Sequence, residues 1–239
     1  MRNRISSRRV LHDPVAQLRV RPRRESAPLS AHELDLLTAP ALRRLIDRGI
    51  TTAIVPFGSV EEQNGHLPLG ADSLLADLAG REIAERLDAV LAPTTRIGVA
   101  QQHGGTLSVP AETLTDTAVA LAESLASQGF RLIVFLPTHG GNFEPLNSAV
   151  ARFNEGHIGA RACAPRGDVG PDPGSHSGKW LTSVMLALRP ELVDLPAATD
   201  DLRAELQDAD AHTGAANFER YVSSIVGQIK QQPAAPPRP

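Results

Sequence analysis

The stretch Thr52-Ala-Ile-Val-Pro-Phe-Gly-Ser-Val-Glu-Glu-Gln-Asn-Gly-His-Leu-Pro-Leu-Gly-Ala-Asp72 joins an apolar run to a segment with three carboxylates and one histidine. The apolar run, residues 51–57, predicts a strand that is buried on both faces. Polar side chains that follow a buried strand lie at its carboxyl end, where open α/β sheets bind their ligands. This stretch therefore predicts a functional site at the rim of a central sheet.

The rest of the chain alternates between short apolar runs and segments with helical periodicity. The other expected strands cover residues 89–93, 131–137 and 160–164. The expected helices cover residues 38–47, 73–87, 111–129, 143–153, 179–188 and most of 204–231, and residues 31–37 form a helical turn or two. Such alternation predicts a three-layer α/β fold, with a mostly parallel sheet flanked by helices on both faces.

The ends of the chain differ in composition from the middle. Residues 1–24 carry eight arginines and one acid, and residues 231–239 are rich in proline. We expect residues 1–27 to be a disordered basic tail, residues 28–230 to form one α/β domain and residues 231–239 to be a disordered tail. The basic tail is either a solvated segment or an arm that binds an anion or a partner.

Composition excludes several classes of protein. The net charge of -3 argues against a nucleic-acid binder, and the longest apolar runs fall short of a membrane helix. The single cysteine, Cys163, excludes an intramolecular disulfide and a cysteine-based zinc site, which fits a reducing compartment. The Arg8-Arg9 pair lacks the apolar core of an export signal. We expect a cytoplasmic protein with neither nucleic-acid nor membrane partners.

Three further segments carry polar residues in short glycine-containing motifs. They are Gly105-Thr-Leu-Ser-Val-Pro-Ala-Glu-Thr113, Ile133-Val-Phe-Leu-Pro-Thr-His-Gly-Gly-Asn142 and His176-Ser-Gly-Lys-Trp-Leu-Thr-Ser-Val-Met-Leu186. With the segment 58–72, they occur in an order and with a spacing that resemble the creatininase (creatinine amidohydrolase) family, over roughly residues 35–195. The resemblance implies the family's fold and its metal-dependent hydrolysis of amide bonds.

The resemblance also implies roles for particular residues. Glu61, Asp72 and His139 match three ligands of one metal, with Asp72 at the position that bridges to a second metal, and His176 matches the histidine that shuttles the proton. Carboxylates and neutral imidazoles are natural ligands for zinc, manganese or iron in such a role. The expected cofactor is therefore a divalent metal.

The ligands of the second metal are missing from the matching positions. The position of the histidine that binds the second metal is occupied by Gln63, or by Asn64 if the alignment is shifted by one residue. Its carboxylate falls on Gly141, Lys179 or Leu181, depending on the family member compared. Since a carboxamide is a weak ligand and an ammonium group is none, we expect one metal per chain.

Lys179 stands beside His176 where family members have an acidic residue. One hypothesis places its ammonium near the position of the missing second metal, where it would balance the negative charge of Asp72 and polarise a substrate carbonyl. The alternative is a surface lysine at a helix start. Gly140 and Gly141 suggest a turn with positive φ and close backbone approach, which would leave amides free to hold a substrate anion.

Four other residues need separate interpretation. His66 either lines the site or forms structural hydrogen bonds, and His103 either shapes the pocket or lies on an exposed loop. Glu62 is expected to face solvent. Trp180, the only tryptophan, either caps the pocket or packs its helix.

The sequence thus predicts a metal-dependent hydrolase of an amide C–N bond in a small molecule or short peptide. A metal would activate water beside Glu61 or a neighbour, and His176 would protonate the leaving nitrogen. One alternative is a binding or scaffold protein that has lost the reaction. The other is an isomerase or lyase that uses His176 and Lys179 as an acid/base pair. The resemblance also implies a homo-oligomer, with a hexamer as the common form.

Overall fold

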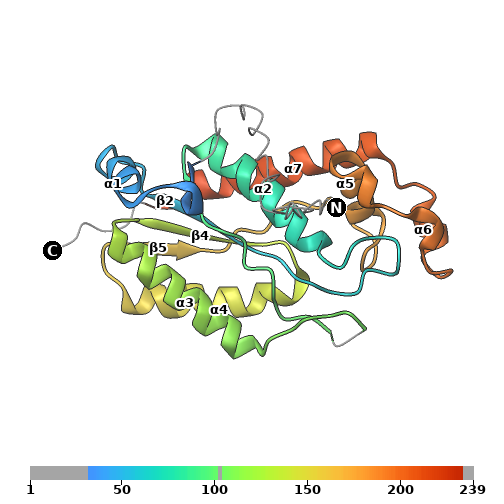
Figure 1. Ribbon diagram of the computed structural model, residues 1–239, viewed down its shortest axis with the longest axis horizontal. Coiled ribbons are helices and arrows are strands. Elements are labelled where there is room, and N and C mark those ends of the chain that lie inside the picture. Colours follow the sequence, from blue (N-terminus) through green and yellow to red (C-terminus); the bar gives the residue numbers. More distant parts are fainter. Residues whose placement is uncertain (1–31, 102–103, 234–239) are drawn as a thin grey trace, which may run out of the picture.

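A parallel sheet of five strands forms the centre of the molecule (Figure 1). The computed structural model describes residues 32–101 and 104–233. The strands are β1 (His32–Glu33), β2 (Thr52–Phe57), β3 (Val90–Leu91), β4 (Leu132–Pro137) and β5 (Arg161–Cys163). Their order across the sheet is β1-β3-β2-β4-β5, which places the two longest strands side by side at the centre.

Helices cover both faces of this sheet, which makes the three layers visible in Figure 1. The α-helices are α1 (Ala39–Asp47), α2 (Ala71–Leu87), α3 (Ala111–Gln128), α4 (Phe143–Gly156), α5 (Lys179–Leu188), α6 (Arg203–Leu206) and α7 (Ala211–Lys230). Short 3-10 turns cover Leu34–Leu36, Gly140–Asn142, Pro190–Leu192 and Leu195–Ala197.

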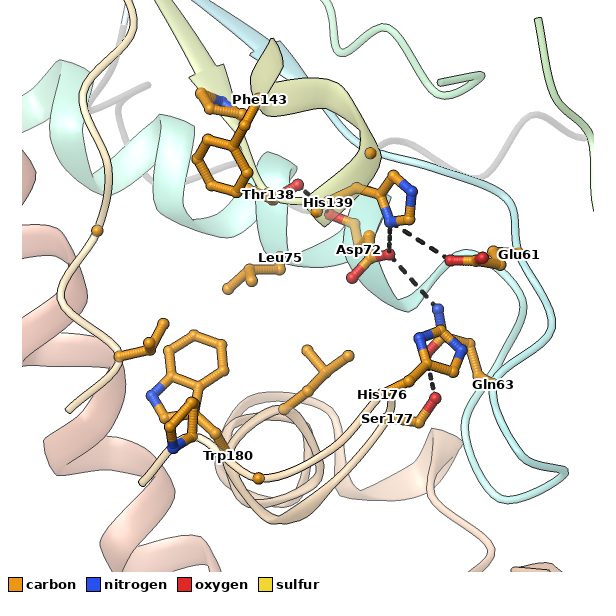
Figure 2. Close-up of a pocket in the computed structure, with 18 of the residues that line it drawn as sticks. Glu61, Gln63, Asp72, Leu75, Thr138, His139, Phe143, His176, Ser177 and Trp180 are labelled. Atoms are coloured by element: carbon orange, nitrogen blue, oxygen red, sulfur yellow. Dashed lines mark hydrogen bonds and ion pairs between the residues drawn. The ribbon is translucent and has the colours of Figure 1, made fainter. Parts of the chain in front are cut away.

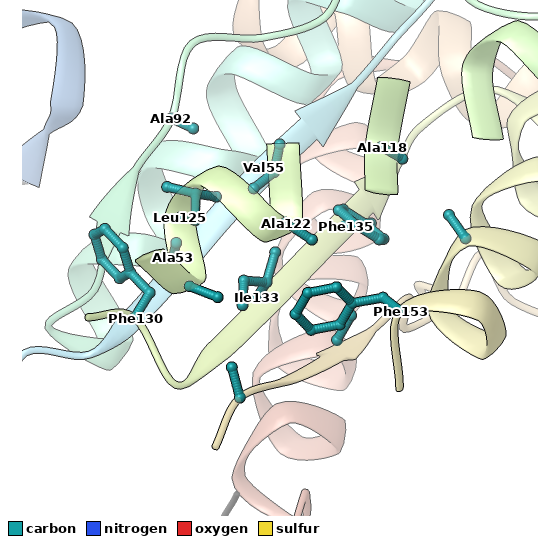
Figure 3. Close-up of a cluster of buried hydrophobic side chains, with 14 of the residues drawn as sticks. Ala53, Val55, Ala92, Ala118, Ala122, Leu125, Phe130, Ile133, Phe135 and Phe153 are labelled. Carbon is teal, nitrogen blue, oxygen red and sulfur yellow. The ribbon is translucent and has the colours of Figure 1, made fainter. Parts of the chain in front are cut away.

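Side chains of the two central strands point alternately to opposite faces of the sheet, because successive residues of a strand alternate. One face packs against α1, α3 and α4 (Figure 3) and buries Ala53, Val55, Ile133 and Phe135. The other face packs against α2, α5 and α7 and buries Ile54, Val134 and Leu136. Both sides of these strands are apolar because both are covered.

The predicted fold class is confirmed, and the boundaries of most elements agree within one or two residues. Residues 31–37 were expected to form a helical turn or two; residues 34–36 do form a 3-10 turn, but residues 32–33 form a short strand. The helix α2 begins at Ala71, two residues before the expected start. Residues 1–31 and 234–239 lie outside the described residues, so the predicted tails are not tested. No helix of the described chain combines the length and apolarity needed to cross a bilayer.

Candidate metal centre

The site forms where β2 and β4 end. Phe57 pairs with Pro137 in the parallel register, so the residues that follow each strand emerge next to each other. The Thr138 hydroxyl donates to the backbone oxygen of Asp72 at 2.7 Å and contacts that of Phe57 at 3.2 Å. These contacts fix the end of β4 against the start of α2.

Glu61, Asp72 and His139 converge in a buried cluster at this point (Figure 2). His139 Nδ1 lies 3.1 Å from Asp72 Oδ2 and 3.4 Å from Glu61 Oε2. One ligand atom from each residue falls within 4.8 Å of the others. The three predicted metal ligands are therefore brought together, although His139 lies far from Glu61 and Asp72 in the sequence.

Asp72 is placed by the start of α2. It lies in the first turn of the helix, where unpaired backbone N–H groups favour a negative charge. The Ser59 hydroxyl donates to Asp72 Oδ2 at 2.8 Å, and the Gln63 amide nitrogen lies 3.5 Å from the same oxygen. Asp72 therefore lies on α2 and not on the loop before it, because α2 starts two residues before the expected start at residue 73.

Glu61 has one satisfied and one unsatisfied oxygen. Its Oε1 accepts a hydrogen bond from the backbone N–H of Gln101 at 3.2 Å. Its Oε2 is buried and accepts no hydrogen bond within the described chain. Burying a carboxylate oxygen without a partner is costly, and the cost falls when a cation or a donor occupies the adjacent space.

His139 is oriented by the backbone of the neighbouring loop. Its Nε2 lies 2.9 Å from the carbonyl oxygen of Val99, so Nε2 holds the proton that this bond requires. Nδ1 faces the two carboxylates: when it carries a proton it donates to Asp72 Oδ2, and without that proton it offers the lone pair that a metal ligand needs. Burial alone would lower the pKa of His139. The hydrogen bond to Asp72 and the negative charges of Asp72 and Glu61 outweigh this effect, so the net result is a raised pKa.

The donor set fits a divalent cation. Two carboxylates and one imidazole are ligands that zinc and manganese accept, and the imidazole has the second-sphere backbone contact typical of bound histidines. The buried, unpartnered oxygen of Glu61 is the atom that a cation would satisfy. Within residues 32–101 and 104–233, no other group of three such side chains is close enough to share an ion.

His176 lines the same cavity and is exposed, and in Figure 2 it lies below the cluster, next to Gln63. Its Nε2 contacts the backbone oxygen of Glu62 at 2.8 Å, and its own backbone oxygen accepts from the Asn64 side chain at 2.9 Å. Next to it, the Ser177 hydroxyl donates to Gln63 Oε1 at 2.7 Å. The Gln63 carboxamide is thereby held by protein groups on both of its ends, Asp72 and Ser177.

Lys179 does not join the cluster. Its ammonium pairs with Asp172 at 2.9 Å, and this hydrogen bond is the main reason that the pKa of Lys179 is raised. Lys179 does not line the cavity, whereas its neighbours Trp180 and Leu181 do. The arrangement favours the surface-lysine interpretation and gives no support to an ammonium that replaces a metal.

The cavity has a volume of about 660 Å³, within the usual range for small-ligand sites. Glu61, Asp72 and His139 form part of its polar wall. Leu75, Phe143 and Trp180 lie on the other side in Figure 2. The site can therefore hold a substrate with a polar, reacting group at one end and an apolar group at the other.

The residues that orient the ligands include several that sequence reasoning missed. Val99 and Gln101 act through their backbones, so their side-chain types gave no signal. Asn142, which ends the quoted His-Gly-Gly-Asn motif, holds the Val99 N–H with its carbonyl at 3.0 Å and donates to the Gly58 oxygen at 2.8 Å. Ser59 also stood inside a quoted motif, and its position directly after Gly58 was the available signal.

Gly141 has a different structural role from the predicted one. Neither Gly140 nor Gly141 has positive φ. A Cβ on Gly141 would overlap the carbonyl oxygen of Val99 and lie 3.0 Å from His139 Nε2. The predicted close backbone approach is therefore present, but the predicted φ is not.

The other residues that the sequence singled out have either a structural role or a place in the cavity wall. His66 is buried and bonded to Thr182 Oγ1 at 2.8 Å, which is the structural alternative. Glu62 accepts from the Gly65 N–H at 3.1 Å. Trp180 both packs α5 and lines the cavity. His103 lies outside the described residues.

Comparison with known proteins gives consistent matches. The family model Creatininase, described as creatinine amidohydrolase, matches residues 35–234. A mycofactocin precursor peptide peptidase of Mycobacterium ulcerans is 36% identical over 154 residues, which cover 59% of this chain and 59% of that protein. A creatinine amidohydrolase of Pseudomonas putida is 28% identical over 182 residues, which cover 64% of this chain and 70% of that protein.

Among solved structures, a mutant creatininase of the Zn-Zn type superposes with a TM-score of 0.75 at 23% identity. The superposition covers 84% of this chain and 98% of that chain. At this level of identity the likeness establishes the fold. The chain spans about three fifths of the length of the peptidase that it matches.

We expect added Zn²⁺ or Mn²⁺ to raise the melting temperature more at about pH 8 than at about pH 6. The pKa of His139 is raised above its ordinary value of 6.5, so at the lower pH a proton competes with the cation for Nδ1. A raised pKa stabilises the metal-free fold below 6.5, and this contribution is lost as pH rises through the higher folded-state value. Differential scanning fluorimetry with and without metal measures the effect, and an equal or larger shift at the lower pH would contradict it.

Proposed function

Because this chain belongs to the creatininase family and gathers two buried carboxylates and an imidazole at the rim of its sheet, we propose that it hydrolyses an amide C–N bond with one divalent metal. The substrate class is a small molecule or a short peptide. The observation that carries the proposal is the buried Glu61 oxygen, which lacks a hydrogen-bond donor within the described chain and lies beside His139. Matches to a peptide peptidase and a creatinine amidohydrolase support hydrolysis over other reactions.

The three ligands would hold the metal between Asp72 Oδ2, Glu61 Oε2 and His139 Nδ1. A divalent cation at this point supplies Lewis acidity, which makes water a stronger nucleophile and an amide carbonyl a better electrophile. The protein fixes the ligand set beforehand: Ser59 holds Asp72, and the backbones of Gln101 and Val99 hold Glu61 and His139. Zinc or manganese suits these donors, and solved creatininases of Zn-Zn and Mn types are consistent with either metal.

His176 would supply the proton that the leaving nitrogen needs. Its Nε2 donates to the Glu62 carbonyl, so the lone pair of the neutral ring is on Nδ1. An exposed imidazole at the cavity wall can take a proton from water and pass it to an amine through that nitrogen. The contact with Glu62 keeps the ring in place while the proton moves.

A single metal is proposed because the neighbouring polar groups are already occupied by protein partners. Gln63, at the position of a second-metal ligand, is buried and contacts Asp72 and Ser177. Elemental analysis of the purified protein is expected to give about one equivalent of metal per chain, and two equivalents would contradict this part of the proposal.

Replacing His176 with alanine tests the reaction. We expect His176→Ala to lower kcat by about 100-fold to 10,000-fold, the usual contribution of a general acid, and to retain the bound metal. Turnover is measured by mass spectrometry on a panel of short peptides and cyclic amides, with elemental analysis in parallel. His212→Ala is the control, because His212 is exposed and does not line the cavity.

The same experiment separates the alternatives. A wild-type protein that binds metal but turns over no amide would favour the binding or scaffold function. The isomerase or lyase alternative needs Lys179 beside His176, and the ion pair of Lys179 with Asp172 does not favour it. A cytoplasmic location and a homo-oligomer, such as a hexamer, stay predictions of the sequence and its resemblance.

A further inference from the structure

The apolar side of the cavity includes one cationic group. Arg166 lies on the loop after β5 and lines the cavity with Phe143. Its guanidinium carbon sits 4.1 Å from the centre of the Phe143 ring, close enough for a cation–π contact. This contact holds the planar group against the wall and leaves its N–H donors for another partner.

Arg166 forms no ion pair with a carboxylate among residues 32–101 and 104–233. Other arginines in that part of the chain do, as Arg86 does with Glu219 and Arg96 with Asp77. An arginine side chain has five N–H donors and a permanent charge, and it binds carboxylates through two parallel hydrogen bonds. A guanidinium without an acid at a cavity wall is therefore suited to a carboxylate brought by a ligand.

The position of Arg166 is fixed by α7. Its backbone N–H contacts Gln228 Oε1 at 3.4 Å, and its carbonyl accepts from Gln228 Nε2 at 2.7 Å. The next residue, Gly167, packs so closely against the Tyr221 ring that a side chain there would overlap it. Because the backbone is held at both points, the binding of a ligand requires little ordering of the main chain here, although the Arg166 side chain is exposed.

A second group on this wall also lacks a partner. Trp180 is only 7% exposed, and its indole nitrogen is buried with no hydrogen-bond acceptor in the described structure. Leaving a buried donor unpaired costs about 1–3 kcal/mol. The rest of the ring packs among apolar side chains and lines the cavity, so Trp180 contributes an apolar surface beside Arg166.

We propose that Arg166, stacked on Phe143, binds a carboxylate of the substrate, while Trp180 lines the pocket for the apolar group that carries it. The inference rests on the proposed function and narrows its substrate class to amides with a carboxylate, as in a short peptide. An uncharged cyclic amide would leave the guanidinium unpaired. The carboxylate is either the C-terminus of a peptide or an acidic side chain, since the chemistry of recognition is the same.

Binding is tested without turnover through the only tryptophan of the chain, Trp180. Intrinsic fluorescence of the metal-loaded protein is titrated with three probes: acetyl-Ala-Ala-Phe as the free acid, the same peptide as its C-terminal amide, and acetyl-Ala-Glu-Phe-amide. We expect a saturable change in fluorescence with the free acid, with the glutamate peptide or with both. The neutral amide should bind at least about tenfold more weakly. The probe that binds identifies the source of the carboxylate.

The variant Arg166→Gln removes the charge and keeps a polar side chain. This variant is expected to raise the Kd of the carboxylate probes by about 10-fold to 100-fold and to leave the Kd of the neutral amide unchanged. Arg161→Gln is the matched control, because Arg161 is exposed on β5 and does not line the cavity. In turnover assays Arg166→Gln should raise KM for carboxylate peptides with kcat and bound metal nearly unchanged.

Equal binding of charged and neutral probes, or an equal effect of both arginine variants, would overturn the proposal. The outcome for hydrolysis is separate. If the carboxylate probes bind through Arg166 but no peptide is cleaved, the subsite stands and the proposed hydrolysis fails. If peptides are cleaved with no preference for a carboxylate, hydrolysis stands and the subsite fails.

Discussion

The variant Asp72→Asn is expected to lose both bound metal and amide hydrolysis. Asparagine keeps the shape of the side chain but removes its charge, and its nitrogen cannot be a ligand. Hydrolysis should fall by about 1,000-fold or more, because losing roughly 4 kcal/mol of transition-state stabilisation corresponds to that factor. Elemental analysis and peptide turnover measure the two effects, and circular dichroism confirms that the fold remains.

The control for this experiment lies on the same helix. Asp77→Asn removes a charge from α2, but Asp77 is partly exposed and pairs with Arg96. The free energy of unfolding should therefore fall by less than about 1 kcal/mol, and the metal should stay bound. An Asp72→Asn protein that keeps one equivalent of metal and a substantial part of its activity would show that the cluster is not the metal site.

The variant Gly141→Ala is expected to have the largest effect on stability. A methyl group at this position would overlap the Val99 carbonyl, and the backbone must move to admit it. Overpacking of this kind costs about 3 kcal/mol. The same movement displaces the oxygen that holds His139 Nε2, so metal affinity should fall as well. Urea denaturation and metal titration measure the two losses.

The neighbouring glycine provides the matched control. A methyl group on Gly140 meets no atom within 4 Å, and its φ is not positive. Gly140→Ala should therefore change the free energy of unfolding by less than about 1 kcal/mol. If the two alanine variants have the same stability and metal affinity, the close approach of Gly141 to Val99 is not a constraint on the site.

The sheet and the candidate metal ligands could be predicted from the sequence because their signals are local. The apolar runs at 52–57 and 132–137 are typical of strands covered on both faces, and both are found there. Polar residues directly after those strands had to meet once the strands were neighbours. His139 is such a residue, and its motif resemblance made its expected role specific.

Other features depend on contacts that no local pattern reports. The start of α2 was placed two residues late because Gly70, the residue before it, offers no capping side chain as a signal. The orientation of the Lys179 side chain depends on its ion pair with Asp172, and Asp172 lies in a loop whose conformation cannot be predicted from the sequence. No local pattern predicts a role for Arg166, because its placement depends on Phe143 and Gln228, which reach it only in the folded chain.

The loop from Val99 to Gln101 holds two of the candidate ligands by main-chain atoms, one carbonyl for His139 and one amide for Glu61. Main-chain atoms persist through almost any substitution, while both of these loop residues line the cavity. Substitutions at these two positions can therefore change the wall of the cavity without moving the carbonyl and the amide that hold the candidate ligands. At this loop, the shape of the cavity and the placement of the candidate ligands can thus change independently.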